Sequence, residues 1–393
     1  MRITRGIALL ITGIVAGGAL SGCGSSGASP RWAAGSQTTD ASSPPGSPVA
    51  SPAPSPSSAA AAALPATGNP NGHAAVPADA QAVDVSHPNR IIGNGTPASC
   101  TSEELVSAIA VGGIVTFNCG PAPLTITLHE TAKVRNASSR VVIDGGGRIT
   151  LSGGGQRRIL YQNTCDQAQG WTTSHCQDQE TPQLVVQNIT FADGNSTGDK
   201  TEGGGGGAIF DRGGRLKVVN ARFVRNRCDG TGPDLGGAAI RALSQSHNLP
   251  VPIVNSTFGG APGQGGVCSN GGALSSIGVS WAVYNSVLSY NSAVGRGANP
   301  AKGGTPGGGS GGAIYTDGDL FTVKLAGTLI ENNHANEGGG AVFFVSNNHT
   351  GTMSIDGSTL RHNKSDGFET HGFPGIFFLG ARNPTVTGST LQP

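Results

Sequence analysis

A repeated Gly-Gly-Ala-apolar motif constrains the fold of this 393-residue chain more than any other sequence feature. The copies begin at Gly206, Gly236, Gly271, Gly311 and Gly339, and Gly375-Ile376-Phe377 is a degenerate sixth copy. Such self-similarity indicates stacked structural units. One unit of about 30 residues cannot bury an apolar face by itself, so neighbouring units must pack on each other. The sequence therefore predicts a solenoid.

A second motif lies between these copies and consists of a large apolar residue followed three positions later by Asn. The pairs are Phe223 with Asn226, Leu288 with Asn291, Leu329 with Asn332 and Leu360 with Asn363; Phe191 with Asn195 is one residue longer, and Phe258 and Leu391 lack the Asn. The longest spacing between these apolar residues contains a Gly-rich insert at 295–310. Short β-branched runs between Gly and Asn turns predict parallel strands, with the Asn side chains bonded from coil to coil.

The two motifs together resemble the repeats of polymorphic outer-membrane proteins. The segment 141–147, Val-Val-Ile-Asp-Gly-Gly-Gly, followed by Ile149-Thr150-Leu151, is similar to the opening coils of pectate lyase-like β-helices. The resemblance covers about residues 100–393. It implies an all-β fold, namely a single-stranded right-handed parallel β-helix, which we assign to residues 89–393.

The start of this domain predicts a short capping helix. Thr101 followed by Glu104 is a capping box, and Leu105, Val106 and Ile109 share one side of the helix that it opens. We expect this helix to cover the first coil, with strands following at 114–117 and 124–128.

The first 88 residues carry an export signal and a tether. Residues 1–22 have a basic start and an apolar run, and they end at Cys23 in a sequence that resembles a bacterial lipobox. We expect lipid on Cys23, which would anchor an exported protein to a membrane. Residues 23–88 are rich in Ser, Ala, Pro and Gly, a composition that predicts a disordered tether.

The seven cysteines are an odd number, which in an exported protein indicates a free thiol or an intermolecular bond. With Cys23 assigned to lipid, three local pairs remain as a hypothesis: Cys100 with Cys119, Cys165 with Cys176, and Cys228 with Cys268. The spacing of Cys and His does not suggest a zinc site.

The balance of charges argues against nucleic acid as a partner. The chain has 24 Lys and Arg against 23 Asp and Glu, and removal of the leader with Arg2 and Arg5 leaves 22 against 23. A nucleic-acid binder needs a basic surface. No phosphate-binding loop is present in the sequence either, so we expect no nucleotide cofactor, and no other cofactor is indicated.

Catalytic residues are not evident. The resemblance to pectate lyase-like enzymes implies either Ca²⁺ held by carboxylates with an Arg or Lys base, or clustered Asp residues. The candidates that the sequence offers are Asp211, Asp317, Asp319, Arg212, Arg215, Asp366 and His371. Turns in Gly-rich coils use Asp freely, so a structural role is the simpler interpretation and the catalytic residues stay unknown.

Aromatic residues follow three of the Gly-Gly-Ala motifs at equivalent positions. Phe210, Tyr315 and Phe343 come directly after Ile209, Ile314 and Val342, and period-two alternation must send the two sets to opposite sides of the strand. If the aliphatic residues point inward, the aromatic residues form an exposed stripe that can stack against sugar rings. The alternative, which we favour, is that the aromatic residues form the interior stack.

Three classes of function remain open at this point. The first is a non-catalytic, adhesin-like surface protein that binds polysaccharide or another surface partner. The second is a polysaccharide lyase or glycoside hydrolase, and the third is a structural spacer of the cell envelope. The lack of an evident carboxylate cluster favours binding, although fold and composition are weak guides to function.

Overall fold

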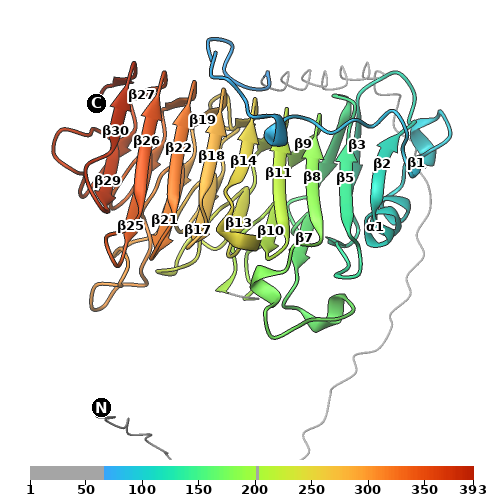
Figure 1. Cartoon of the computed structure of the whole chain (residues 1–393), viewed down its shortest axis with the longest axis horizontal. Helices are drawn as coiled ribbons and strands as arrows, with labels where there is room; N and C mark the ends of the chain where they lie inside the picture. The colour runs from blue at the N-terminus through green and yellow to red at the C-terminus, as the bar shows by residue number, and fades with distance from the viewer. Residues whose placement is uncertain (1–65, 201–202) are drawn as a thin grey trace, which may run out of the picture. The chain divides into compact units, whose positions relative to one another are not determined.

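The computed structural model describes residues 66–200 and 203–393, and within them it is dominated by parallel strands (Figure 1). The predicted leader, Cys23 and most of the predicted tether lie outside the described residues. Each pairing between the named strands is parallel, which agrees with the all-β prediction.

The largest sheet has ten strands. In spatial order they are β1 (Arg90–Ile92), β2 (Gly113–Phe117), β5 (Arg140–Asp144), β8 (Gln183–Gln187), β11 (Arg215–Val219), β14 (Val251–Val254), β18 (Trp281–Tyr284), β22 (Thr322–Ala326), β26 (Thr352–Asp356) and β30 (Thr385–Thr387).

The second sheet has nine strands: β3 (Leu124–Thr127), β6 (Ile149–Ser152), β9 (Thr190–Ala192), β12 (Arg222–Val224), β15 (Thr257–Phe258), β19 (Val287–Ser289), β23 (Leu329–Glu331), β27 (Thr359–Arg361) and β31 (Thr390–Leu391).

The third sheet has eight strands: β4 (Ala132–Lys133), β7 (Leu160–Asn163), β10 (Ile209–Arg212), β13 (Ile240–Ala242), β17 (Leu274–Ile277), β21 (Ile314–Gly318), β25 (Val342–Ser346) and β29 (Ile376–Leu379). A small fourth sheet contains β16 (Val267–Cys268), β20 (Ser292–Ala293), β24 (His334–Ala335) and β28 (Lys364–Ser365).

The chain visits the sheets in turn, from the ten-stranded to the nine-stranded to the eight-stranded sheet, and then returns beside its previous strand. This order is compatible with a parallel β-helix. It corrects the expectation of a single-stranded helix in one respect, because the strands are divided among three large sheets. The physical reason lies in the Gly and Asn turns, which break each coil into separate short strands.

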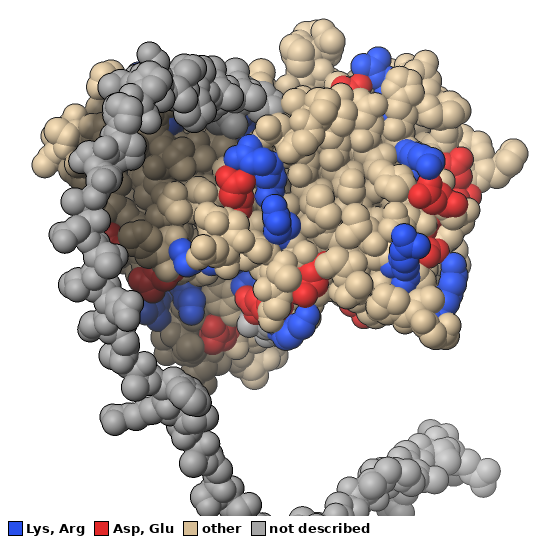
Figure 2. All heavy atoms as spheres, turned by 180° about the vertical axis from the view of Figure 1, so that it is seen from behind, with Lys and Arg blue, Asp and Glu red and all other residues tan. Residues whose placement is uncertain are grey.

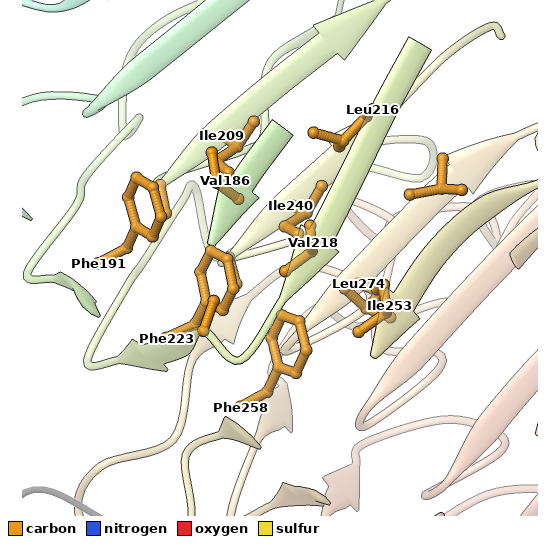
Figure 3. Packing of buried hydrophobic residues seen from close by; sticks show 14 of the residues in the cluster. Val186, Phe191, Ile209, Leu216, Val218, Phe223, Ile240, Ile253, Phe258 and Leu274 are labelled. Carbon is orange, nitrogen blue, oxygen red and sulfur yellow. The ribbon is translucent and has the colours of Figure 1, made fainter. Parts of the chain in front are cut away.

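Three inward-facing sets of side chains form the core between the sheets. Phe191, Phe223 and Phe258 of the nine-stranded sheet stack with ring centroids 5.1 and 4.6 Å apart, and all three are buried. Figure 3 shows this stack beside Val186, Val218 and Ile253 of the ten-stranded sheet and Ile209, Ile240 and Leu274 of the eight-stranded sheet. Burial of such side chains stabilises the fold by about 1.5–3 kcal/mol each.

The capping-box prediction agrees with the structure. Helix α1 (Ser102–Val111) begins after Thr101, whose hydroxyl accepts a hydrogen bond from the Glu104 amide at 3.2 Å. Leu105 and Ile109 are fully buried in the same core cluster as the first strands. The other named helical segments of the described residues are single 3₁₀ turns: η1 (Ala78–Ala80), η2 (Pro97–Ser99), η3 (Gln167–Gln169), η4 (Cys176–Asp178) and η6 (Ser246–Asn248).

The predicted asparagine ladder exists, with a shift of one residue in one coil. Asn291 donates to Asn333 Oδ1 at 2.9 Å, and Asn333 donates to Asn363 Oδ1 at 2.8 Å. The buried apolar partner in that coil is Ile330, which pairs with Leu288 and Leu360, so the repeat residues there are Ile330 and Asn333 and not Leu329 and Asn332. Either residue of each doublet fits the sequence pattern, and only strand pairing distinguishes them.

The three predicted disulfides are confirmed. Cys100 bonds Cys119, Cys165 bonds Cys176 and Cys228 bonds Cys268, with Cα–Cα distances of 5.8, 5.0 and 4.8 Å.

Residues 66–88, which we call the strap, differ from the predicted disordered tether. The strap crosses the strands of the ten-stranded sheet on their outer side (Figure 1, blue). The Asn285 side chain bonds the backbone N and O of Ala74 at 2.8 and 2.9 Å, and the Gln187 side chain bonds those of Val83 at 2.8 and 2.9 Å. A polar segment needs no core of its own when amide side chains of a finished sheet satisfy its backbone.

Candidate functional site

The outer face of the eight-stranded sheet carries one continuous row of side chains. In strand order the row is Lys133, Tyr161, Phe210, Arg241, Ser275, Tyr315, Phe343 and Phe377, each paired in register with the next. The neighbouring aliphatic residues, such as Ile209 and Ile314, belong to the central core. The row therefore points away from the core, by the alternation of a β-strand.

The aromatic members of this row are nevertheless buried, except Phe377 at its end, which is half-buried. Phe210 and Tyr315 have no exposed surface, and Phe343 is 3 % exposed. Both sequence alternatives are thereby corrected: the rings face outward, but they form no exposed stripe. The rings are buried because they stack on one another along the row and because loops lie over the strands. Alternation within one strand predicts the direction of a side chain but not whether it is covered.

Different segments cover different parts of the row. The Arg158 guanidinium lies 5.0 Å from the centroid of the Phe210 ring. Asn299, from the Gly-rich insert, donates to the Tyr315 hydroxyl at 2.9 Å, and Phe368 meets Phe343 edge-on.

At the N-terminal end of the row the cover is incomplete, and a cleft of about 480 Å³ opens there. Its lining is almost entirely polar: Thr131, Lys133, Arg158, Tyr161, Asn163, Cys165, Asp166, Gln167 and Asp199. Strands β4 and β7 supply the floor. The Cys165–Cys176 disulfide fixes the loop that forms one wall. We call this feature the polar cleft.

Arg158 is the fixed cation of the polar cleft. It is 5 % exposed, and it donates to Asp199 Oδ2 at 2.6 Å and to the carbonyl oxygens of Gly206 and Gly205 at 2.9 and 2.8 Å. Burial lowers the pKa of Arg158, and the Asp199 carboxylate opposes that shift. These bonds hold the guanidinium in place, so it is a scaffold for the cleft and not a free base.

Tyr161 and Asp166 form the second fixed group. The Tyr161 hydroxyl donates to Asp166 Oδ2 at 3.1 Å and accepts from Asn163 Nδ2 at 2.9 Å. Burial raises the pKa of Tyr161 well above its usual value. Burial also acts to raise the pKa of Asp166, but hydrogen bonds from Gln169, the Ala168 amide and Tyr161 outweigh it and keep that pKa below normal. At neutral pH the phenol therefore stays protonated and the carboxyl stays ionised.

Lys133 and Gln167 are the exposed members of the cleft. The Lys133 ammonium lies 6.0 Å from the centroid of the Tyr161 ring, at the limit of a cation–π contact. Together with the fixed carboxylates, these side chains present donors and acceptors in a concave polar space. Such a lining can both donate hydrogen bonds to a hydroxyl-rich ligand and accept them from it.

The Asp and Arg candidates from the sequence do not gather into an active site. Asp211 is fully buried and accepts hydrogen bonds from Gln162 and Gln245, and burial raises its pKa well above normal. Asp317 lies elsewhere on the sheet, bonded by Asn299 and Asn347 at 2.9 and 3.0 Å. Arg215 lies on the outer side of the ten-stranded sheet, and Arg212 and Asp319 do not line the cleft.

The candidates Asp366 and His371 do not form a site either. Asp366 binds His334 at 2.8 Å and Lys364 at 2.7 Å, whereas His371 is exposed. Within residues 66–200 and 203–393, no group of three or more His, Cys, Asp or Glu is arranged to hold a metal ion. No helix in the same part of the chain is long and apolar enough to cross a membrane.

The surface charge is sparse and mixed. Figure 2 shows Lys and Arg beside Asp and Glu in small groups on one face, separated by wide uncharged areas. This face offers no continuous basic surface for a nucleic acid.

Comparison with known proteins gives no relative from which a function can be carried over: no family model, curated protein or solved structure matches this chain. Its function must be argued from the polar cleft and its surroundings.

Sequence reasoning missed Tyr161 and the rest of the cleft. The signal was present, since Leu160-Tyr161 has the same apolar-aromatic order as Ile209-Phe210, but the Gly-Gly-Ala motif that flagged the later coils is absent there. Trp171, in the loop closed by the Cys165–Cys176 disulfide, was also missed, and its side chain is 42 % exposed.

Proposed function

We propose that this protein is an exported, lipid-anchored surface protein that presents a right-handed parallel β-helix and binds polysaccharide in the polar cleft. The observation that carries the proposal is the cleft itself, a concave polar space of about 480 Å³ that opens beside the outer row of the eight-stranded sheet. A disulfide-fixed wall and a buried, fully bonded Arg158 make the space rigid before a ligand arrives. Preorganisation of this kind reduces the entropic cost of binding.

The ionised state of the two carboxyl groups in the polar cleft favours binding over catalysis. Two carboxylates do converge there with a Lys and an Arg, which is the arrangement that a lyase or hydrolase would need. However, Asp166 has a lowered pKa and Asp199 is bonded to Arg158, so neither is suited to act as a general acid. A polysaccharide lyase remains the second candidate, because Lys133 is exposed at the same cleft.

The test is retention on a panel of immobilised polysaccharides. Lys133→Ala with Gln167→Ala should weaken retention on the glycan that the parent protein binds, whereas Arg382→Ala, at an exposed residue outside the cleft lining, should not. Equal retention of the double variant would contradict the proposal. If the bound glycan instead accumulates an unsaturated uronate product with ultraviolet absorbance, and Lys133→Ala stops this, the lyase is the correct function.

Export and anchoring are proposed on separate grounds. The three disulfides indicate an oxidising compartment. The lipobox-like sequence supports a mature chain that begins at a lipidated Cys23. Cys23→Ser should abolish labelling by a fatty-acid probe and release the protein from the membrane fraction. Unchanged labelling would reject the anchor.

A further inference from the structure

The strap and the ten-stranded sheet enclose a second pocket, distinct from the polar cleft. Its volume is about 270 Å³. The lining residues are Pro77, Asp79, Ala80, Arg140, Gln183, Leu184, Val185, Arg215, Leu216, Lys217, Leu249, Pro250, Pro252, Ala282 and Tyr284. We call it the strap pocket. It combines an apolar lining with a concentration of positive charge.

Three cations converge at the strap pocket against a single lining acid. Arg140 and Arg215 lie in one row of the sheet, joined through Gln183, and Lys217 lies one row further along β11. Asp79 of the strap is the acid. The lining of the strap pocket therefore carries an excess of positive charge.

The cations are not fully used by the protein. The Lys217 ammonium donates to the carbonyl oxygens of Asp79 and Gln81 at 2.9 and 2.8 Å, which leaves one of its three donors. Arg215 Nη2 donates to the Pro250 carbonyl at 3.3 Å, whereas its buried Nε atom has no partner. The Arg215 side chain lines the pocket, so an anion bound there would compensate the charge of its guanidinium.

Electrostatics agree with this geometry. Burial lowers the pKa of Lys217 first, and the charge of Arg140 lowers it further while Asp79 opposes the shift. Burial likewise lowers the pKa of Arg215. A ligand anion would relieve the repulsion among the three cations.

The apolar lining limits what can carry the anion. Tyr284 and Ala282 at the pocket are already buried beneath the strap, whereas Pro252 is half-buried and Leu249 is 45 % exposed. A bare inorganic ion would leave Leu249 and Pro252 in contact with water. A compact body with an apolar or pyranose face would cover them.

We propose that the strap pocket is a second binding site, for a carboxylate or phosphate group carried on a compact sugar or apolar body. Arg215 and Arg140 bind the anionic group, the apolar lining packs against the body, and the strap closes the pocket through Lys217. This site is independent of the polar cleft and does not rest on the glycan proposed there.

The experiment uses the full chain and calorimetric titration with three probes of one size class. Methyl glucuronide supplies a carboxylate, glucose 6-phosphate supplies a phosphate on the same kind of ring, and methyl glucoside is the neutral control. We expect at least one anionic probe to bind, the neutral one not to bind, and added salt to weaken binding. Binding of only one anionic probe assigns the chemical source of the anion.

Two variants locate the site. Arg215→Gln should weaken binding about tenfold, the value of one charge-assisted hydrogen bond. Arg140→Gln should also weaken binding of the anionic probe. Because Arg140 is exposed, this variant keeps the test valid if Arg215→Gln fails to fold. The matched control is Arg382→Gln, with Lys133→Ala as the control for the polar cleft. The proposal is overturned if neither anion binds, if the neutral probe binds equally, or if Arg140→Gln and Arg382→Gln behave alike.

Discussion

The molecule has two sets of stacked aromatic rings that differ in what covers them. Phe191, Phe223 and Phe258 stack inside, between the sheets, while Tyr315, Phe343 and Phe377 stack outside on the eight-stranded sheet, with centroids 5.0 and 5.2 Å apart. The inner set is enclosed by side chains from three sheets. The outer set is covered by loops. The near-complete burial of Tyr315 and Phe343 thus hides a difference in rigidity, because loops can collapse onto a gap more readily than sheets can.

Removal of an inner ring should have the largest effect. Phe223→Ala lies in the middle of the inner stack, and we expect the free energy of unfolding to fall by about 3–5 kcal/mol in urea titrations. Phe223→Leu, which keeps most of the volume, should cost less than about 1.5 kcal/mol. A Phe223→Ala protein as stable as the parent would show that the inner core is loosely packed.

Removal of an outer ring should cost less stability and also affect the polar cleft. Phe210→Ala should lower the free energy of unfolding by about 2 kcal/mol, because Arg158 and its loop can settle into the space. Retention on the cognate polysaccharide should weaken, since Phe210 supports both Arg158 and Tyr161. The comparison between the two stacks fails if Phe210→Ala destabilises the protein as much as Phe223→Ala.

The residue after Phe210 gives a pH-dependent test of inward orientation. Asp211 has a raised pKa in the folded protein, so the unfolded chain loses its proton first and stability falls as the pH rises from about 4 toward the folded pKa. Asp211→Asn should remove this slope and be the more stable protein at neutral pH. Gln162 Oε1, now without a partner, can accept from the new amide. Parallel pH profiles of the two proteins would contradict the burial of Asp211.

The smallest effect is expected on the outer side, at Asp166. Its pKa is lowered in the folded protein, so its contribution to stability is present above about pH 4 and is lost as the pH falls through the folded value. Asp166→Asn should lack this acid-side loss. Thermal unfolding between pH 2 and pH 5 measures the difference, which should be small because the carboxyl is partly open to solvent.

The sequence predicted the strands where local signals are strong. The Gly-Gly-Ala and apolar-Asn motifs mark the later coils, and the capping box marks α1, because these patterns act through backbone conformation and side-chain alternation within a few residues. The odd number of cysteines left six for disulfides once Cys23 was set aside. Their positions then suggested the three pairs, because the two cysteines of each pair lie in the same coil or in neighbouring coils. The sequence pattern could not fix the register to a single residue at Leu329-Ile330 and Asn332-Asn333, because either residue of each pair fits the motif equally well.

What the tertiary structure alone decided is how the outer surfaces are covered. The strap has the composition of a disordered segment, and it lies on the sheet because Gln187, Asn285 and Lys217 bond its backbone and because its small apolar residues pack on the outer side of the sheet. The polar cleft joins Lys133, Tyr161 and Asp199 from three different segments, and the row in which Phe210 stands is buried by loops far along the chain. Local motifs predict to which side of its strand a side chain points. The residues that then cover this side chain are distant in sequence, and no local pattern encodes those contacts.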